Sequence, residues 1–111
     1  MNILVLGDVV SRCGCEKVRR TVPAFKRLKK IDLCFANGEN SAKGNGITPE
    51  SADFLFSSGV DFITTGNHAF RRAEMYDYFD RSDCVIRPYN YPAGAPGKAP
   101  ESSTWEECAS A

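Results

Sequence analysis

Four short runs of apolar residues recur along the first 87 residues of the chain. Three of them, "NILVL" (2–6), "IDLCFAN" (31–37) and "VDFITT" (60–65), predict strands, and "CVIR" (84–87) predicts a fourth. The first run is continuously apolar from its second residue onward, which predicts a buried strand.

Residues 14–30, which follow the first predicted strand, have apolar positions at helical spacing. The residues on this predicted face are Val18, Val22, Phe25 and Leu28. Pro23 lies inside the pattern, and a proline cannot donate the backbone hydrogen bond that a helix interior requires. We therefore expect either a kinked helix or two short helices.

A second predicted helix has clear start and stop signals. Thr48 is a typical N-cap, Pro49 fits the first helical position, and Gly59 follows the predicted end. Ile47 and Ala52 have the spacing of a weak hydrophobic staple across the cap. These signals predict a helix that begins at Pro49 and ends just before Gly59.

A third, shorter helix is predicted over residues 70–80, with Ala73, Tyr76 and Phe79 on one face. Strands that alternate with helices predict an α/β fold with right-handed crossovers and a largely parallel sheet. The segment "PYNYPAGAPGKAP" (88–100) is too rich in Pro and Gly to extend the sheet. Residues 98–111 lack periodicity, so we expect a disordered tail.

The composition sets limits on both size and partners. A chain of 111 residues with 42% hydrophobic residues fits one small domain with a modest core. Fourteen basic and fourteen acidic residues cancel, which gives no electrostatic support for binding to nucleic acid or membranes. Residues 12–30 hold eight basic residues and one acid, a cluster that we interpret as a solvated helix face rather than a phosphate-binding patch.

The N-terminus and the cysteines predict a cytoplasmic protein. The run "ILVL" is too short for a signal peptide or a membrane span, and no basic segment precedes it. The five cysteines form no CxxC motif, and Cys34 and Cys84 are expected to be small buried hydrophobes. Cys13 and Cys15 form a CxC pair, but no nearby histidine or further cysteine would complete a zinc site.

Glycine followed by polar residues ends three of the predicted strands, in "GD" (7–8), "GEN" (38–40) and "GNH" (66–68). Carboxyl ends of parallel strands meet at one edge of a sheet, so these turns are expected to converge there. Glycine at such positions lets the backbone turn sharply and approach a ligand closely. The polar side chains that this edge would gather are Asp8, Glu39, Asn40, Asn67 and His68.

Two carboxylates, two amides and one imidazole suit hard or borderline divalent metals such as Mn²⁺ or Fe²⁺. Clustered acids repel each other unless a cation lies among them. Structural roles remain open for single residues, since Asp8 could cap the following turn. Asn37 and Asn40 could occupy left-handed turn positions. His68 could likewise cap or flank the helix that follows it.

The chain resembles the YmdB-like branch of the metallophosphoesterases over residues 1–97. The stretches "NILVLGDVV", "IDLCFANGENSAKGNGITP", "SGVDFITTGNH" and "RPYNYPAGAPG" carry this resemblance. It implies the N-terminal half of a four-layer α/β/β/α sandwich over a dinuclear metal centre. Such enzymes hydrolyse phosphodiesters, including 2′,3′-cyclic nucleotides, with two divalent metal ions for which Mn²⁺ or Fe²⁺ is expected.

The resemblance also implies a role for each site residue. By position, Asp8 and Asn40 would bind one metal ion, Glu39 would bridge both, and Asn67 would bind the second. His68 would act as the general acid, or would stabilise charge on the departing oxygen.

Members of this family are more than twice as long, and their second half is implied to supply three further histidine ligands. His68 is the only histidine in this chain. We therefore expect residues 1–97 to form a truncated domain with a partial metal site and little or no activity alone. One face of its sheet would be open, which predicts aggregation or a homo-oligomer. The alternative is a non-catalytic module that binds nucleotide or metal, or that dimerises.

Overall fold

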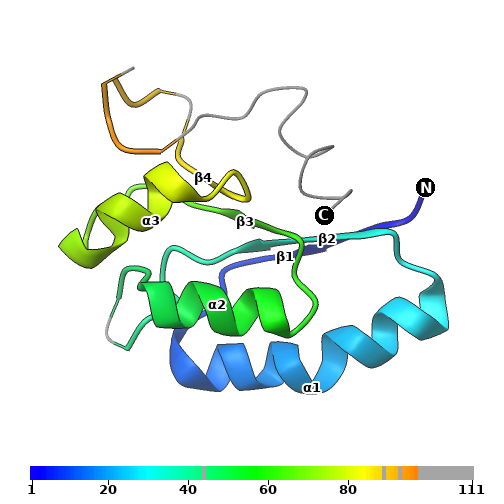
Figure 1. The fold of residues 1–111 in the computed structure, drawn as a ribbon. Helices are drawn as coiled ribbons and strands as arrows, with labels where there is room; N and C mark the ends of the chain where they lie inside the picture. The colour runs from blue at the N-terminus through cyan, green and yellow to red at the C-terminus, as the bar shows by residue number, and fades with distance from the viewer. Residues whose placement is uncertain (44, 89, 93, 98–111) are drawn as a thin grey trace.

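The computed structural model describes residues 1–43, 45–88, 90–92 and 94–97, which form an α/β unit around one parallel sheet (Figure 1). The sheet has four strands in the order β1-β2-β3-β4, and each neighbouring pair is parallel. The strands are β1 (Ile3–Leu6), β2 (Leu33–Asn37), β3 (Phe62–Thr64) and β4 (Val85–Ile86). This confirms the predicted fold class and the predicted parallel pairing.

The helices are α1 (Ser11–Lys29), α2 (Pro49–Ser57) and α3 (Tyr76–Arg81), and a short 3-10 helix, η1 (Ala73–Met75), precedes α3. Figure 1 shows α1 and α2 lying side by side along one face of the sheet. A strand order that follows the chain order, with right-handed crossovers, places successive helices on the same face. The described residues therefore form two layers, one of helices and one of strands.

α1 is a single helix of 19 residues that begins at Ser11 and contains Pro23. This excludes the alternative of two short helices, and a kink at Pro23 stays a prediction. The predicted apolar face is correct for Val18 and Val22 only, since Leu28 is 77% exposed. The buried face continues instead to Lys26, whose Nζ donates to the backbone oxygen of Gly59 at 3.0 Å and to an Asp61 carboxylate oxygen at 3.0 Å.

α2 begins as its sequence signals predict. Thr48 is the N-cap, Pro49 follows it, and the Ser51 hydroxyl closes a capping box by accepting from the Thr48 backbone N–H. Ile47 and Ala52, the two positions of the predicted staple, are both fully buried. Gly59 follows the helix with a φ of 108°, a conformation that favours glycine.

The third helix is shorter than predicted, and a different set of its residues faces the core. Its first turn is η1, and α3 ends at Arg81. Met75 and Phe79 are the buried residues of this segment, whereas Tyr76 is 42% exposed, so the predicted face is correct for Phe79 alone. The spacing of four residues between Met75 and Phe79 places both against the core.

The two faces of the sheet differ in what covers them. On the helical side, Leu4 and Leu6 of β1 pack against a core that includes Val22, Leu55 and Ile63. Ile3 and Val5 alternate with them and are 51% and 71% exposed, so the prediction of a buried strand is wrong for these two residues. β1 therefore presents apolar side chains to solvent on the face away from the helices.

Some sequence expectations concern single residues or the C-terminal segment. Cys34 is fully buried as predicted, whereas Cys84 is only partly buried. The predicted tail at 98–111 lies outside the described residues, so its disorder stays a prediction. Every helix in the described part of the chain is too short or too polar to cross a membrane.

Candidate functional site

The three turns that follow β1, β2 and β3 are joined to one another through backbone hydrogen bonds. The Val9 N–H donates to the Asn37 oxygen at 3.0 Å, and the Gly38 N–H donates to the Thr64 oxygen at 3.0 Å. The turn after β1 is therefore hydrogen-bonded to the end of β2, and the turn after β2 is hydrogen-bonded to the end of β3. The predicted convergence at the carboxyl ends of the strands is present.

Asn40 connects Asp8 to His68 at this edge. Its Nδ2 donates to Asp8 Oδ1 at 3.0 Å, and its Oδ1 lies 2.6 Å from His68 Nδ1. Because the amide nitrogen faces the carboxylate, the amide oxygen faces the imidazole and accepts a hydrogen bond. His68 Nδ1 is then the donor, and Nε2 is left to meet another group.

Glu39 is held beside the same imidazole. Its Oε2 accepts from the His68 backbone N–H at 2.8 Å and lies 3.7 Å from His68 Nδ1. Its Oε1 lies 3.4 Å from Asn37 Nδ2, which is a long hydrogen bond. The Glu39 side chain is 14% exposed, so this carboxylate is the more enclosed acid of the site, since Asp8 is exposed.

Gly66 makes room for that carboxylate. A Cβ atom at this position would lie closer to Glu39 Oε1 than real Cβ contacts allow. The positive φ values among the described glycines are at Gly46, Gly59 and Gly97, so the glycines before the site residues serve no left-handed turn. At Gly66 the close approach is to Glu39.

Helix capping and left-handed turn positions, the alternative roles considered for these residues, do not fit the structure. The N-cap of α1 is Val10, which has no side-chain cap hydrogen bond, so Asp8 does not cap that helix. The described non-glycine residues with positive φ are Ser11 and Lys30, which excludes left-handed turn positions for Asn37 and Asn40. The N-cap of η1 is Arg72 rather than His68, and it has no side-chain cap hydrogen bond either.

Asn67 differs from the other predicted ligands in having no side-chain partner within the described residues. Its side chain is exposed, and it makes no hydrogen bond or ion pair within the described residues. Across the part of the chain that the structure describes, His, Cys, Asp and Glu nowhere gather in a group of three or more that could hold a metal ion. Printed contacts thus join Asp8, Glu39, Asn40 and His68, and the metal-binding role of Asn67 stays a prediction.

Two hollows lie near the site. A groove of about 410 Å³ is lined by Asp8 and Lys17, with Leu6, Val9 and Val18 among its apolar walls. It leaves one side of the Asp8 carboxylate accessible and places a lysine in the same groove.

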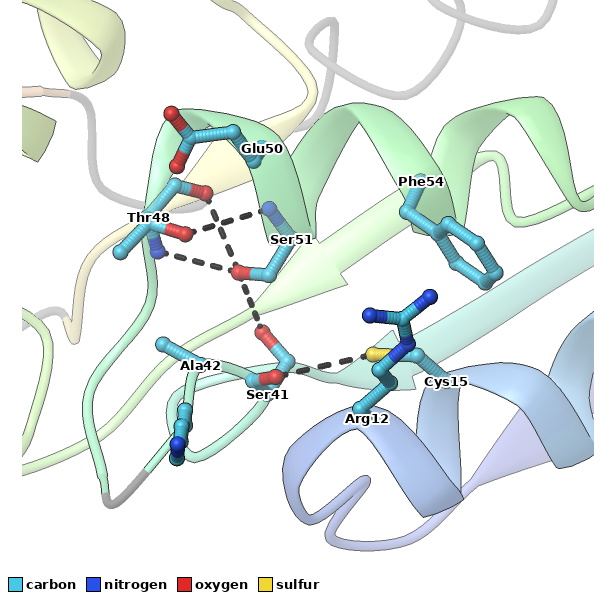
Figure 2. Close-up of a pocket in the computed structure, with 9 residues that line it drawn as sticks. Arg12, Cys15, Ser41, Ala42, Thr48, Glu50, Ser51 and Phe54 are labelled. Atoms are coloured by element: carbon cyan, nitrogen blue, oxygen red, sulfur yellow. Dashed lines mark hydrogen bonds between the residues drawn. The ribbon is translucent and has the colours of Figure 1, made fainter.

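A second cavity, of about 220 Å³, lies between α1 and the start of α2 (Figure 2). Figure 2 shows the hydroxyl of Ser41 bonded to that of Ser51, which is itself bonded to Thr48. This cavity is below the usual range of ligand pockets, roughly 300–1,000 Å³, and these hydroxyls already have partners. The cavity lies where α1, the start of α2 and the turn after β2 pack together.

A comparison with known protein families shows which family the chain belongs to. The family model described as "YmdB-like protein" matches residues 4–108. This chain belongs to the YmdB-like family. The Bacillus subtilis (strain 168) 2′,3′-cyclic-nucleotide 2′-phosphodiesterase is 42% identical over 98 residues, which cover 88% of this chain.

Solved structures agree with this affiliation. A hypothetical protein from Thermus thermophilus matches 88% of the chain with a TM-score of 0.81 and 41% identity. A phosphatase from Mycoplasma pneumoniae matches 86% of the chain with a TM-score of 0.78 and 27% identity. The Bacillus relative is named as a phosphodiesterase and the Mycoplasma protein as a phosphatase.

The chain spans a minor part of the length of these relatives. It covers 37% of the Bacillus phosphodiesterase, 38% of the Thermus protein and 36% of the Mycoplasma phosphatase. The boundary that the sequence suggests near residue 97 stays a prediction, since the family match continues to residue 108.

Proposed function

We propose that this chain contributes one part of a metal-dependent phosphodiesterase centre. The observation that carries the proposal is the continuous set of contacts from Asp8 through Asn40 and His68 to Glu39 at the carboxyl ends of three parallel strands. The name of the Bacillus relative supports a phosphodiester, and in particular a 2′,3′-cyclic nucleotide, as the substrate.

The chemistry of the donors fits hard or borderline divalent cations. Glu39 Oε1 and the exposed Asp8 carboxylate are hard oxygen ligands of the kind that Mn²⁺ and Fe²⁺ accept. The amide oxygen of Asn40 has a second lone pair beside the one that faces His68. Asn67, whose exposed side chain makes no hydrogen bond within the described residues, stays the proposed ligand of a second cation.

A bound cation would offset the negative charge that develops on the phosphoryl oxygens during hydrolysis. The residues of this chain would position the His68 ring and protonate the departing oxygen. Asp8 orients the Asn40 amide, and Asn40 fixes the His68 ring by accepting from Nδ1. His68 Nε2 is then the atom that can face the departing oxygen.

We expect weak cation binding and little or no turnover from this chain alone, because an incomplete ligand set holds metal ions poorly. The test is an assay of the purified protein with Mn²⁺ or Fe²⁺ on bis-p-nitrophenyl phosphate and on 2′,3′-cyclic AMP. Calorimetry with Mn²⁺ in parallel should detect binding that Glu39→Gln and Asp8→Ala both abolish. Turnover that disappears in His68→Ala would show that these residues suffice for catalysis and would contradict the expected inactivity.

We also propose that two copies of the chain associate through β1. This strand is bonded on one side only within the described sheet, and its outer face carries Ile3 and Val5 in exposed positions. An edge strand with apolar side chains favours pairing with another chain. Sedimentation velocity should show a defined dimer that Val5→Asp converts to monomer. A purely monomeric unchanged protein would exclude this association.

A further inference from the structure

Asn37 has an unusual hydrogen-bonding state at the end of β2. Its Nδ2 donates to Glu39 Oε1 at 3.4 Å. Its Oδ1 is buried and accepts no hydrogen bond, which is true of no other buried side-chain oxygen or nitrogen in the described part of the chain. Exchanging the two amide atoms would set oxygen against a carboxylate oxygen, so this orientation is the favoured one.

A buried acceptor without a partner is unfavourable, and native proteins satisfy nearly all such groups. The fold does not require an amide here. The backbone oxygen of Asn37 accepts from Val9, and that bond is available to any residue. An apolar residue of the same shape would remove the unmatched oxygen, so the amide needs an explanation beyond the fold.

The neighbouring carboxylate supplies that explanation. Glu39 Oε2 already accepts from the His68 N–H at 2.8 Å, whereas Oε1 has only the long contact to Asn37. Oε1 is thus the Glu39 oxygen with capacity for a further ligand. A hydrated divalent cation bound there would bring water O–H groups next to the Asn37 amide, and those groups are donors.

We propose that Asn37 is a positioning residue of the candidate cation site. Its Nδ2 orients Glu39, and its Oδ1 accepts a hydrogen bond from a water molecule on the bound cation. This inference rests on the proposed cation site at Glu39 and deepens it by assigning a residue that holds the cation's hydration shell. Partners of this kind orient the ligands that they contact and tune metal affinity.

The test compares Asn37→Leu with the unchanged chain in two measurements. Leucine has the branched shape of asparagine and no acceptor. We expect Mn²⁺ binding about tenfold weaker by calorimetry. Without metal, in EDTA, we expect a thermal midpoint close to that of the unchanged chain, because removal of the unmatched acceptor offsets loss of the long hydrogen bond from Asn37 to Glu39. Asn45→Leu, the same change at a partly buried loop position, is the control and should leave Mn²⁺ affinity unchanged.

Asn37→Asp provides a second variant if the leucine protein does not fold. It keeps the acceptor but places a carboxylate beside Glu39, so its midpoint should fall in EDTA and recover with Mn²⁺. Its Mn²⁺ affinity should be at least that of the unchanged chain.

Three results would overturn the inference. One is an Asn37→Leu protein with a lower midpoint in EDTA and unchanged Mn²⁺ affinity, which would give Asn37 a purely structural role and leave the proposed function intact. Another is an Asn37→Asp protein that binds Mn²⁺ more weakly than the unchanged chain. The third is an unchanged chain that binds no Mn²⁺ at all, which would contradict the cation site itself.

Discussion

The two faces of β1 differ in burial, although both carry apolar residues. Leu4 and Leu6 face the helices and pack against the core, whereas Ile3 and Val5 face outward and are mostly exposed. Along β2 the same alternation places Cys34 and Ala36 in the core and leaves Asn37 on the other row. Along β1 the fold therefore depends on the helical row. The outer row of β2 and β3 also contains the buried Leu33 and Phe62, and it leads to the candidate chemistry.

The largest expected effect comes from truncating the helical face at its centre. Ile63 of β3 is fully buried, and its partner Val85 on β4 belongs to the same core cluster. We expect Ile63→Ala to lower the free energy of unfolding by about 2–5 kcal/mol, because it loses apolar burial and leaves a cavity. Urea denaturation measures this. A loss no larger than that of a surface substitution would show that the helical face does not hold the fold.

A smaller effect on the same face is expected from alkaline pH. Burial raises the pKa of the Cys34 thiol from 9.0 to about 11, with Asp61 adding to the rise and Lys26 opposing it. Between these values the unfolded chain loses the thiol proton before the folded chain does. Stability should therefore be complete below pH 9 and should fall by up to about 2 kcal/mol as the pH rises toward 11.

Thermal unfolding across this pH range tests the expectation. Cys34→Ala should show a weaker dependence on pH, while Cys13→Ala, at an exposed free cysteine, should follow the unchanged chain. Equal dependence in all three proteins would mean that Cys34 does not control alkaline stability.

The smallest effect is expected on the outer face. Val5 is 71% exposed, and Val5→Thr keeps a β-branched side chain of similar shape. We expect the free energy of unfolding to change by less than about 0.5 kcal/mol, as for other surface substitutions. Urea denaturation at low protein concentration checks this value. A loss comparable to that of Ile63→Ala would show that something covers this face, and the contrast between the two rows would fail.

The sequence predicted the parts of the fold that local signals control. Thr48 and Pro49 mark the start of α2 because capping and proline geometry act within a few residues. Phe25 and Leu28 were assigned to a buried face because helical spacing cannot show how far a sheet extends beneath a helix. They are 40% and 77% exposed, and Lys26 takes the inward position.

For the candidate site, residue types at strand ends were sufficient to predict which turns converge. They were not sufficient to predict the pairing of Asn40 with both Asp8 and His68, since that depends on side-chain rotamers. Asn37 was interpreted only as a turn residue. Its place two residues before Glu39, at the end of a strand, was the available signal, but an unmatched acceptor becomes visible only with atomic contacts.

Gly66 has a consequence for how this site can vary. Because a methyl group there would occupy the space of the Glu39 carboxylate, no side chain can be added without moving that acid. In a library randomised at this codon, clones selected for retention of Mn²⁺ should return glycine alone, whereas selection for folding should also accept alanine or serine. The difference between the two selections would show whether glycine is required at this position for metal binding or for folding.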